Sequence, residues 1–188
     1  AALRLVAETF PFSQGSALLM PESCHTSVLG MRGPAGARGA RCFCAKDADT
    51  YVRLAAEVSA AIAATGLRGA SADGCATHGS TPPPAIHGSA TDAATVHSLS
   101  VVTPECNLTG DKTDVAARVL TRLGASQGAS GGGTKGPQDG RAAPASRWWV
   151  MLDGAKAATG ELHLPSTGAA FCCVSFYKLF GAPTGFWA

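Results

Sequence analysis

Two ionisable side chains stand where apolar segments of strand length end. Asp153 closes the run RWWVMLD, and Lys178 comes shortly after the run FCCVS. A carboxylate is costly in such a place unless a cation or several hydrogen-bond donors meet it, and a lysine must either reach solvent or be held in a pocket. Asp153 could instead cap the segment GAKAATG that follows it. The residues alone leave a functional and a purely structural explanation open for each.

Taken together, Asp153 and Lys178 favour one kind of chemistry. Lysine is the side chain that forms a Schiff base with an aldehyde cofactor, especially where burial and nearby charge lower its pKa. An aspartate can keep a pyridine nitrogen protonated, so that the ring of pyridoxal phosphate (PLP) accepts electrons. The pair therefore suggests a PLP site.

Four more residues could complete such a site. His25, in the segment ESCHTS, could lie over an aromatic ring and transfer protons, although a histidine at a strand-to-helix junction is also a capping or core residue. Asn107 could hydrogen-bond a phenolic oxygen or simply shape a turn. Ser175 and Tyr177 carry hydroxyl groups beside Lys178 that could hold a phosphate.

The surrounding sequence predicts a scaffold that gathers strand ends. Residues 51–62 repeat apolar side chains at helical spacing after a capping aspartate, Asp47 or Asp49, and residues 3–9 and 114–123 are also predicted to be helical. Strands are expected at 16–20, 41–45, 97–103, 147–153 and 171–175. Alternating helices and continuous apolar strands are typical of an α/β fold with a mostly parallel sheet. Ligands bind such sheets beyond the carboxyl ends of the strands.

Two low-complexity stretches interrupt this pattern. Residues 66–96 and 124–146 are rich in Gly, Ala, Ser and Pro and lack periodic apolar residues, so we expect them to be disordered inserts. The 188 residues otherwise fit one domain, 1–188. Because the chain starts without Met in a predicted helix and ends just after a turn, we expect it to be part of a longer protein.

Composition excludes several classes of partner. A net charge of +2 is too small to indicate binding to nucleic acid or to an anionic membrane, so we expect a small-molecule or protein partner. No apolar run approaches the roughly 20 residues that span a bilayer. The seven cysteines include no CxxC pair, which indicates a reducing, cytoplasmic compartment and no metal site.

Five separated segments resemble one family in order and spacing. They are AALRLVAETFPFSQGS, HTSVLGMRGPAGARGA, PECNLTG, WWVMLDGAK and FCCVSFYKLFGAPTG. The chain is similar in these segments to the molybdenum cofactor sulfurases, which belong to the class V aminotransferase and cysteine desulfurase group of fold-type I PLP enzymes. The resemblance covers most of the chain outside the two inserts and implies that it is part of a PLP-binding large domain.

The resemblance also assigns roles. It implies that Lys178 carries the cofactor, that Asp153 pairs with the pyridinium nitrogen and that His25 stacks on the ring. Asn107 matches a position near the phenolic oxygen, and Lys156 occupies a position that is glutamine in the wider desulfurase group.

Ser175 matches a phosphate ligand, whereas Tyr177 stands where many relatives have histidine. DGAK replaces the usual DAAK, Ala170 replaces an aspartate and Trp187 a glycine, but none of these departures removes a named catalytic group.

The implied activity is sulfur mobilisation. Such enzymes take sulfur from L-cysteine, leave alanine and an enzyme persulfide, and deliver the sulfur to the molybdenum cofactor or to molybdoenzymes of the xanthine dehydrogenase and aldehyde oxidase type. We expect the persulfide cysteine and the phosphate-binding turn to lie outside this chain, so that the isolated chain is inactive, and the full-length protein is compatible with a homodimer. A plain cysteine desulfurase or selenocysteine lyase, or a catalytically silent binding module, remains an alternative; the SFYK segment favours the sulfurase.

Overall fold

A five-stranded parallel sheet forms the centre of the molecule. A computed structural model describes residues 2–65, 95–106, 110, 112, 118–119, 121–123, 145–157 and 168–181. The strand order is β2-β1-β3-β4-β5, and each of the four neighbouring pairs is parallel. The strands are β1 (Ala17–Pro21), β2 (Arg41–Ala45), β3 (Thr95–Val102), β4 (Ala145–Asp153) and β5 (Phe171–Cys173). The predicted α/β class with a parallel sheet is confirmed.

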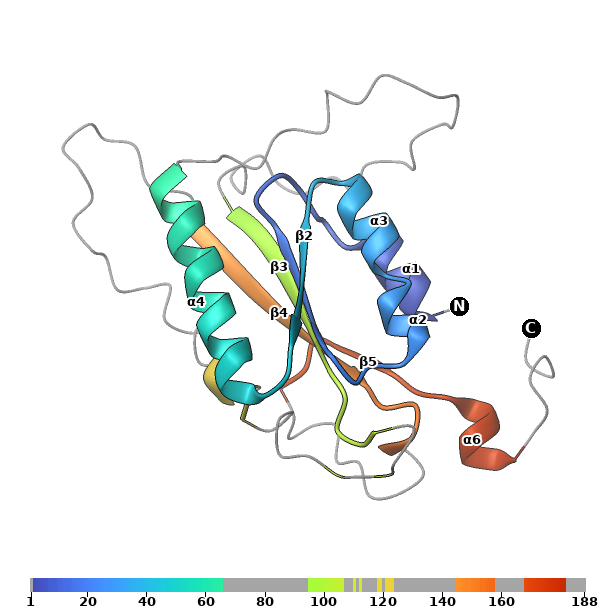
Figure 1. Ribbon diagram of the computed structural model, residues 1–188. Helices are drawn as coiled ribbons and strands as arrows, with labels where there is room; N and C mark the ends of the chain where they lie inside the picture. The colour runs from blue at the N-terminus through green and yellow to red at the C-terminus, as the bar shows by residue number, and fades with distance from the viewer. Residues whose placement is uncertain are drawn as a thin grey trace, which may run out of the picture.

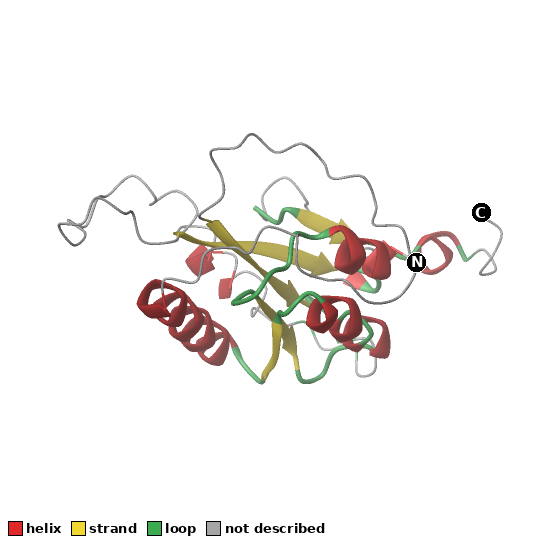
Figure 2. Ribbon diagram, turned by 90° about the horizontal axis from the view of Figure 1, so that it is seen from above, coloured by secondary structure: helices red, strands yellow, loops and turns green. Residues whose placement is uncertain are grey.

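Helices cover both faces of this sheet (Figures 1 and 2). The long helix α4 (Ala48–Thr65) lies on one face, and α1 (Ala2–Thr9), α2 (Thr26–Leu29) and α3 (Arg32–Ala37) lie on the other. The short helix α6 (Phe176–Phe180) follows β5 and lies beyond its end. Among the described helices, none is long and apolar enough to cross a membrane.

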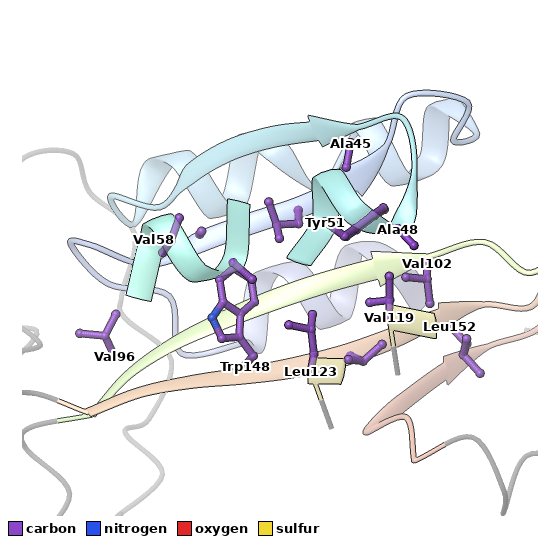
Figure 3. Close-up of a cluster of buried hydrophobic side chains, with 14 of the residues drawn as sticks. Ala45, Ala48, Tyr51, Val58, Val96, Val102, Val119, Leu123, Trp148 and Leu152 are labelled. Carbon is purple, nitrogen blue, oxygen red and sulfur yellow. The ribbon is translucent and has the colours of Figure 1, made fainter. Parts of the chain in front are cut away.

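Helix α4 shows why the local sequence folds as predicted. Asp47 caps it, because the Thr50 N–H donates to Asp47 Oδ1 at 2.7 Å. Its apolar residues at helical spacing are buried against the sheet, and the Tyr51 hydroxyl donates to the Val101 carbonyl at 2.7 Å. Figure 3 shows this cluster, in which Tyr51, Val58 and Trp148 lie between α4 and the strands.

The opposite face has its own core. Buried side chains from the α1–α3 layer pack on those of β1, β3 and β4 that point to the same side, including Phe10, Met31, Leu18 and Met151. Because both faces of β1 and β3 are covered, these strands are buried almost throughout, as expected for a parallel sheet.

Two predicted boundaries need correction. Strand β3 begins at Thr95 and β4 at Ala145, so the last two residues that we assigned to each insert belong to strands. The two added strand starts pair with each other in the parallel sheet, since Thr95 pairs with Ala145. Residues 66–94 and 124–144 lie outside the described part of the chain, so their predicted disorder stays a prediction. In the predicted helix 114–123, residues 118–119 and 121–123 are helical.

We predict opposite effects on stability when two serines on β3 are replaced by alanine. Ser98 and Ser100 are fully buried and, being two residues apart, point to the same face. Ser98 Oγ accepts a hydrogen bond from the Ala17 N–H at 3.0 Å, whereas Ser100 Oγ has no partner among the described residues. Thermal and urea unfolding should show that Ser100→Ala adds about 1 kcal/mol to the free energy of unfolding, because it removes an unsatisfied hydroxyl. Ser98→Ala should lower it by about 1–3 kcal/mol. Equal effects of the two changes would contradict the assignment.

Candidate functional site

The strand order creates a natural place for a ligand. β1 lies between β2 and β3, so successive strands are added on opposite sides of it, and ligands bind beyond the carboxyl ends of strands at such a switch point. His25 follows β1, Asp153 ends β4 and Lys178 follows β5. Because all the strands are parallel, these three residues lie at the same edge of the sheet.

A cavity of about 560 Å³ opens at this edge. Its wall comes from the first turn of α1, from α2 and α3 with their connection, and from the ends of β4 and β5. Asp153 is the buried polar group of this wall, with only 3% of its surface exposed. The lining residues are Ala2, Leu3, Arg4, Ser27, Gly30, Pro34, Asp153, Ala155, Cys173 and Val174. The volume lies within the range of small-molecule sites, roughly 300–1,000 Å³.

The Asp153 carboxyl is held between opposing influences. Burial raises its pKa, because the charged form is poorly solvated. The Ala155 N–H, which donates to Asp153 Oδ1 at 3.3 Å, lowers that pKa, and so do His25, when its ring is protonated, and the charge of Lys178. By accepting the hydrogen bond from the Ala155 N–H, Asp153 caps the turn that follows it, which is the structural role that the sequence left open.

His25 is both a helix cap and a neighbour of this carboxyl. It occupies the N-cap position of α2, where its Nδ1 accepts from the Ser27 N–H at 3.2 Å and lies 2.9 Å from Ser27 Oγ. Since a backbone N–H is always a donor, Nδ1 is the acceptor nitrogen and Nε2 carries the proton of the neutral ring. The exposed ring therefore presents an N–H group to its surroundings.

Lys178 lies on α6 with two of the predicted site residues beside it. Ser175 is the N-cap of α6, and its carbonyl accepts from the Lys178 N–H at 3.1 Å, while its side chain makes no capping bond. The Lys178 Nζ lies 6.0 Å from the centroid of the Tyr177 ring. The Lys178 side chain is half-buried, and 43% of the Tyr177 surface is exposed. Like His25, all three residues, Ser175, Tyr177 and Lys178, lie outside the set that lines the cavity.

Lys156 points toward a different feature. Its Nζ lies 3.5 Å from the Cys106 carbonyl and 3.7 Å from Glu105 Oε1, and a Cβ on Gly110 would come within 3.2 Å of it. Lys156 thus contacts the turn after β3 and is not among the cavity-lining residues. Asn107 belongs to that turn in sequence but lies outside the described residues. Its predicted role stays a prediction.

The cavity also contains residues that we did not predict. Ser27 and Cys173 line it with Asp153, and Arg4 lines it from α1. A signal for Ser27 was available, since it lies two residues from His25 in the segment that we singled out. The place of Cys173 follows from the parallel register, which sets it beside Asp153. No local sequence pattern marks Arg4, which reaches the cavity because α1 packs on the sheet.

The cysteines near the site are not poised as nucleophiles. Burial is the main influence that raises the pKa of Cys24, to about 11, and burial also raises the pKa of Cys173. Nucleophilic attack requires the thiolate, and a raised pKa disfavours that form of both thiols at neutral pH. In the described ranges, no group of three His, Cys, Asp or Glu side chains is arranged to hold a metal ion.

Comparison with known proteins identifies a consistent set of relatives. The chain is 31% identical over 188 residues to the molybdenum cofactor sulfurase of Solanum lycopersicum and 32% identical over 189 residues to that of Drosophila willistoni. Each alignment covers 98% of this chain and 20% of the relative, so the chain spans about one fifth of the length of these proteins. The chain matches no established protein-family profile.

A solved structure shows a similar fold. One chain in the crystal structure of a SepCysS–SepCysE N-terminal domain complex superposes with a TM-score of 0.55. The match covers 96% of this chain and 36% of that chain at 11% sequence identity. At this identity the likeness concerns the arrangement of sheet and helices.

Proposed function

We propose, on the premise that the chain belongs to the molybdenum cofactor sulfurase family, that it forms part of a PLP-binding domain that mobilises sulfur from L-cysteine. The observation that carries the proposal is the buried carboxylate of Asp153 in the wall of a ligand-sized cavity, at the sheet edge where His25 and Lys178 also lie. PLP, when bound, supplies an aldehyde for an amine and a ring that accepts electrons.

The residues present fit this cofactor. A carboxylate with 3% of its surface exposed needs a cationic partner, and a protonated pyridine nitrogen provides one. Asp153 would bind that N–H and keep it protonated. Lys178 would hold the cofactor covalently and then return a proton to the substrate carbon. We assign Ser175 and Tyr177, beside Lys178, to the phosphate side of the site, and Asn107 and Lys156 to the phenolic-oxygen side.

His25 is suited to proton transfer next to the ring. Its Nδ1 is occupied by the Ser27 N–H, so the exposed Nε2 is the nitrogen that can exchange a proton with a ligand. The contact with Ser27 also fixes the orientation of the imidazole at the start of α2. His25 would therefore lie over the cofactor ring and act with Lys178 in handling protons.

The family name of the relatives also suggests the sulfur acceptor and the cellular location of this protein. The sulfur acceptor would be the molybdenum cofactor, free or in a molybdoenzyme of the xanthine dehydrogenase and aldehyde oxidase type. The persulfide cysteine would come from another part of the longer protein, because Cys24 and Cys173 are held protonated. The described cysteines form no disulfide with one another, which supports a reducing, cytoplasmic location. A homodimer of the full-length protein is compatible with this scheme.

One experiment separates the proposal from its alternatives. Purified protein is incubated with PLP and then with L-cysteine or L-selenocysteine, and visible absorption and amino-acid products are followed. We expect PLP to give a new visible band that L-cysteine changes, with alanine formed only when the remaining segments of the longer protein are present. No spectral response to PLP would indicate a silent binding module. A response to L-selenocysteine but not to L-cysteine would indicate a selenocysteine lyase.

A further inference from the structure

Arg4 lies on α1 and forms an exposed ion pair that contributes little to the stability of that helix. Its Nε donates to Glu8 Oε1 at 2.7 Å, but a base placed four residues before an acid is the less favourable order for such a pair. The guanidinium of Arg4 therefore has little function within the helix itself.

The position of Arg4 in the cavity wall suggests a role in ligand binding. Arg4 and Asp153 both line the cavity, and they differ sharply in exposure. The Arg4 side chain is 79% exposed, whereas Asp153 is 3% exposed. The cavity wall thus combines an exposed basic residue with a buried carboxyl. This arrangement suits a ligand with an anionic and a cationic end.

We propose that Arg4 binds the oxyanion, a phosphate or a carboxylate, of a ligand whose cationic end faces Asp153. The inference rests on the proposed function, since it names how the same cavity orients its ligand. Glu8 engages only the Nε of the guanidinium, and among the described residues Nη1 and Nη2 have no partner. These two groups can bind a phosphate or carboxylate with paired hydrogen bonds. Because Glu8 holds Nε, it would be the positioning residue for this arginine.

The chain contains a matched control for this arginine. Arg53 and Glu57 form the same kind of pair, four residues apart on α4, with Arg53 Nη1 at 2.6 Å from Glu57 Oε1 and both side chains exposed. This pair lies on the helix that covers the opposite face of the sheet and does not line the cavity. Arg53→Gln therefore removes an equivalent surface charge without touching the cavity.

Inorganic phosphate is the first probe, measured by the broadening of its phosphorus NMR signal as protein is added. We expect wild-type protein and Arg53→Gln to bind phosphate alike, Arg4→Gln to bind it about tenfold or more weakly, and Arg4→Lys to be intermediate because an ammonium lacks the paired geometry. Circular dichroism would verify that α1 remains folded. Equal binding by wild type and Arg4→Gln, or no binding by wild type, would overturn the proposal.

Two further comparisons identify the source of the oxyanion. If Arg4→Gln weakens binding of PLP but not of pyridoxal, which lacks the phosphate, Arg4 recognises the cofactor. If it weakens binding of L-cysteine but not of its methyl ester, Arg4 recognises the amino acid. Pyridoxal attached to Lys178 with phosphate binding unchanged by Arg4→Gln would refute the Arg4 site alone. Arg4-dependent phosphate binding without any attachment at Lys178 would support the Arg4 site and refute the proposed function.

Discussion

Asp153→Asn should make the ligand-free protein more stable at neutral pH and at the same time weaken PLP binding by at least about tenfold. The affinity loss follows because asparagine cannot supply the charge-assisted hydrogen bond, worth about 1.5–3 kcal/mol, that a carboxylate gives to a pyridinium N–H. The gain in stability follows because asparagine has a similar shape without the charge that burial penalises. Calorimetry and a PLP titration would measure both effects.

The pH dependence gives this prediction a definite sign. Burial raises the folded-state pKa of Asp153 above its unfolded value, so the folded protein keeps this proton to a higher pH than the unfolded chain does. Wild-type stability should therefore fall as pH rises from the ordinary carboxyl range through the raised pKa. Asp153→Asn should lack that fall, and the two proteins should converge in acid. An advantage for Asp153→Asn that grows on acidification would contradict this account.

A matched acidic residue controls for charge alone. Asp49 is exposed and pairs with Arg118 at 3.2 Å and Arg122 at 3.3 Å on the opposite face of the sheet. Asp49→Asn should leave PLP binding unchanged and lower stability slightly, since exposed ion pairs contribute only about 0–1 kcal/mol. A loss of PLP affinity in Asp49→Asn would show that overall charge, rather than the cavity, determines binding.

Lys178→Ala should abolish covalent attachment of PLP at the site. The side chain lies at the carboxyl edge of the sheet, near enough to Asp153 to influence its carboxyl, and alanine has no amine to bond the aldehyde. Borohydride reduction of the PLP-treated protein, followed by peptide mass spectrometry, should find the adduct on the Lys178 peptide of the wild type and no site-specific adduct in the variant.

Surface lysines react with aldehydes as well, so this test needs its own control. Lys46 is exposed and follows β2 at the same edge of the sheet. Lys46→Ala should keep both the adduct on Lys178 and the visible absorption band. If the adduct spreads evenly over exposed lysines in the wild type and Lys178→Ala changes nothing, Lys178 is not the cofactor lysine.

Much of the fold was predictable because its elements carry local signals. The apolar spacing of residues 51–62 and the capping oxygen of Asp47 predict α4, and continuous apolar runs predict strands buried on both faces. The parallel arrangement follows from the alternation of the two kinds of element. The strand starts at Thr95 and Ala145 were missed because their pairing is between distant segments of low-complexity sequence, which no local window contains.

The site was predictable only in part, for a related reason. Asp153 and Lys178 could be singled out because each follows an apolar strand, and the parallel topology places such residues at one edge. Arg4 reaches the cavity through the packing of α1 on the sheet, and Cys173 through the register of β5 beside β4. The turn contacted by Lys156 likewise depends on tertiary geometry.

The most direct test of the central claim is a crystal structure of the protein soaked with PLP. The account predicts that the ring lies in the cavity between α1 and the ends of β4 and β5, with its aldehyde carbon bonded to Lys178 Nζ. The pyridine nitrogen should lie about 2.7–2.9 Å from an Asp153 carboxylate oxygen, as for a charge-assisted hydrogen bond. A ring bound elsewhere, or a ring in the cavity with its nitrogen turned away from Asp153, would contradict it.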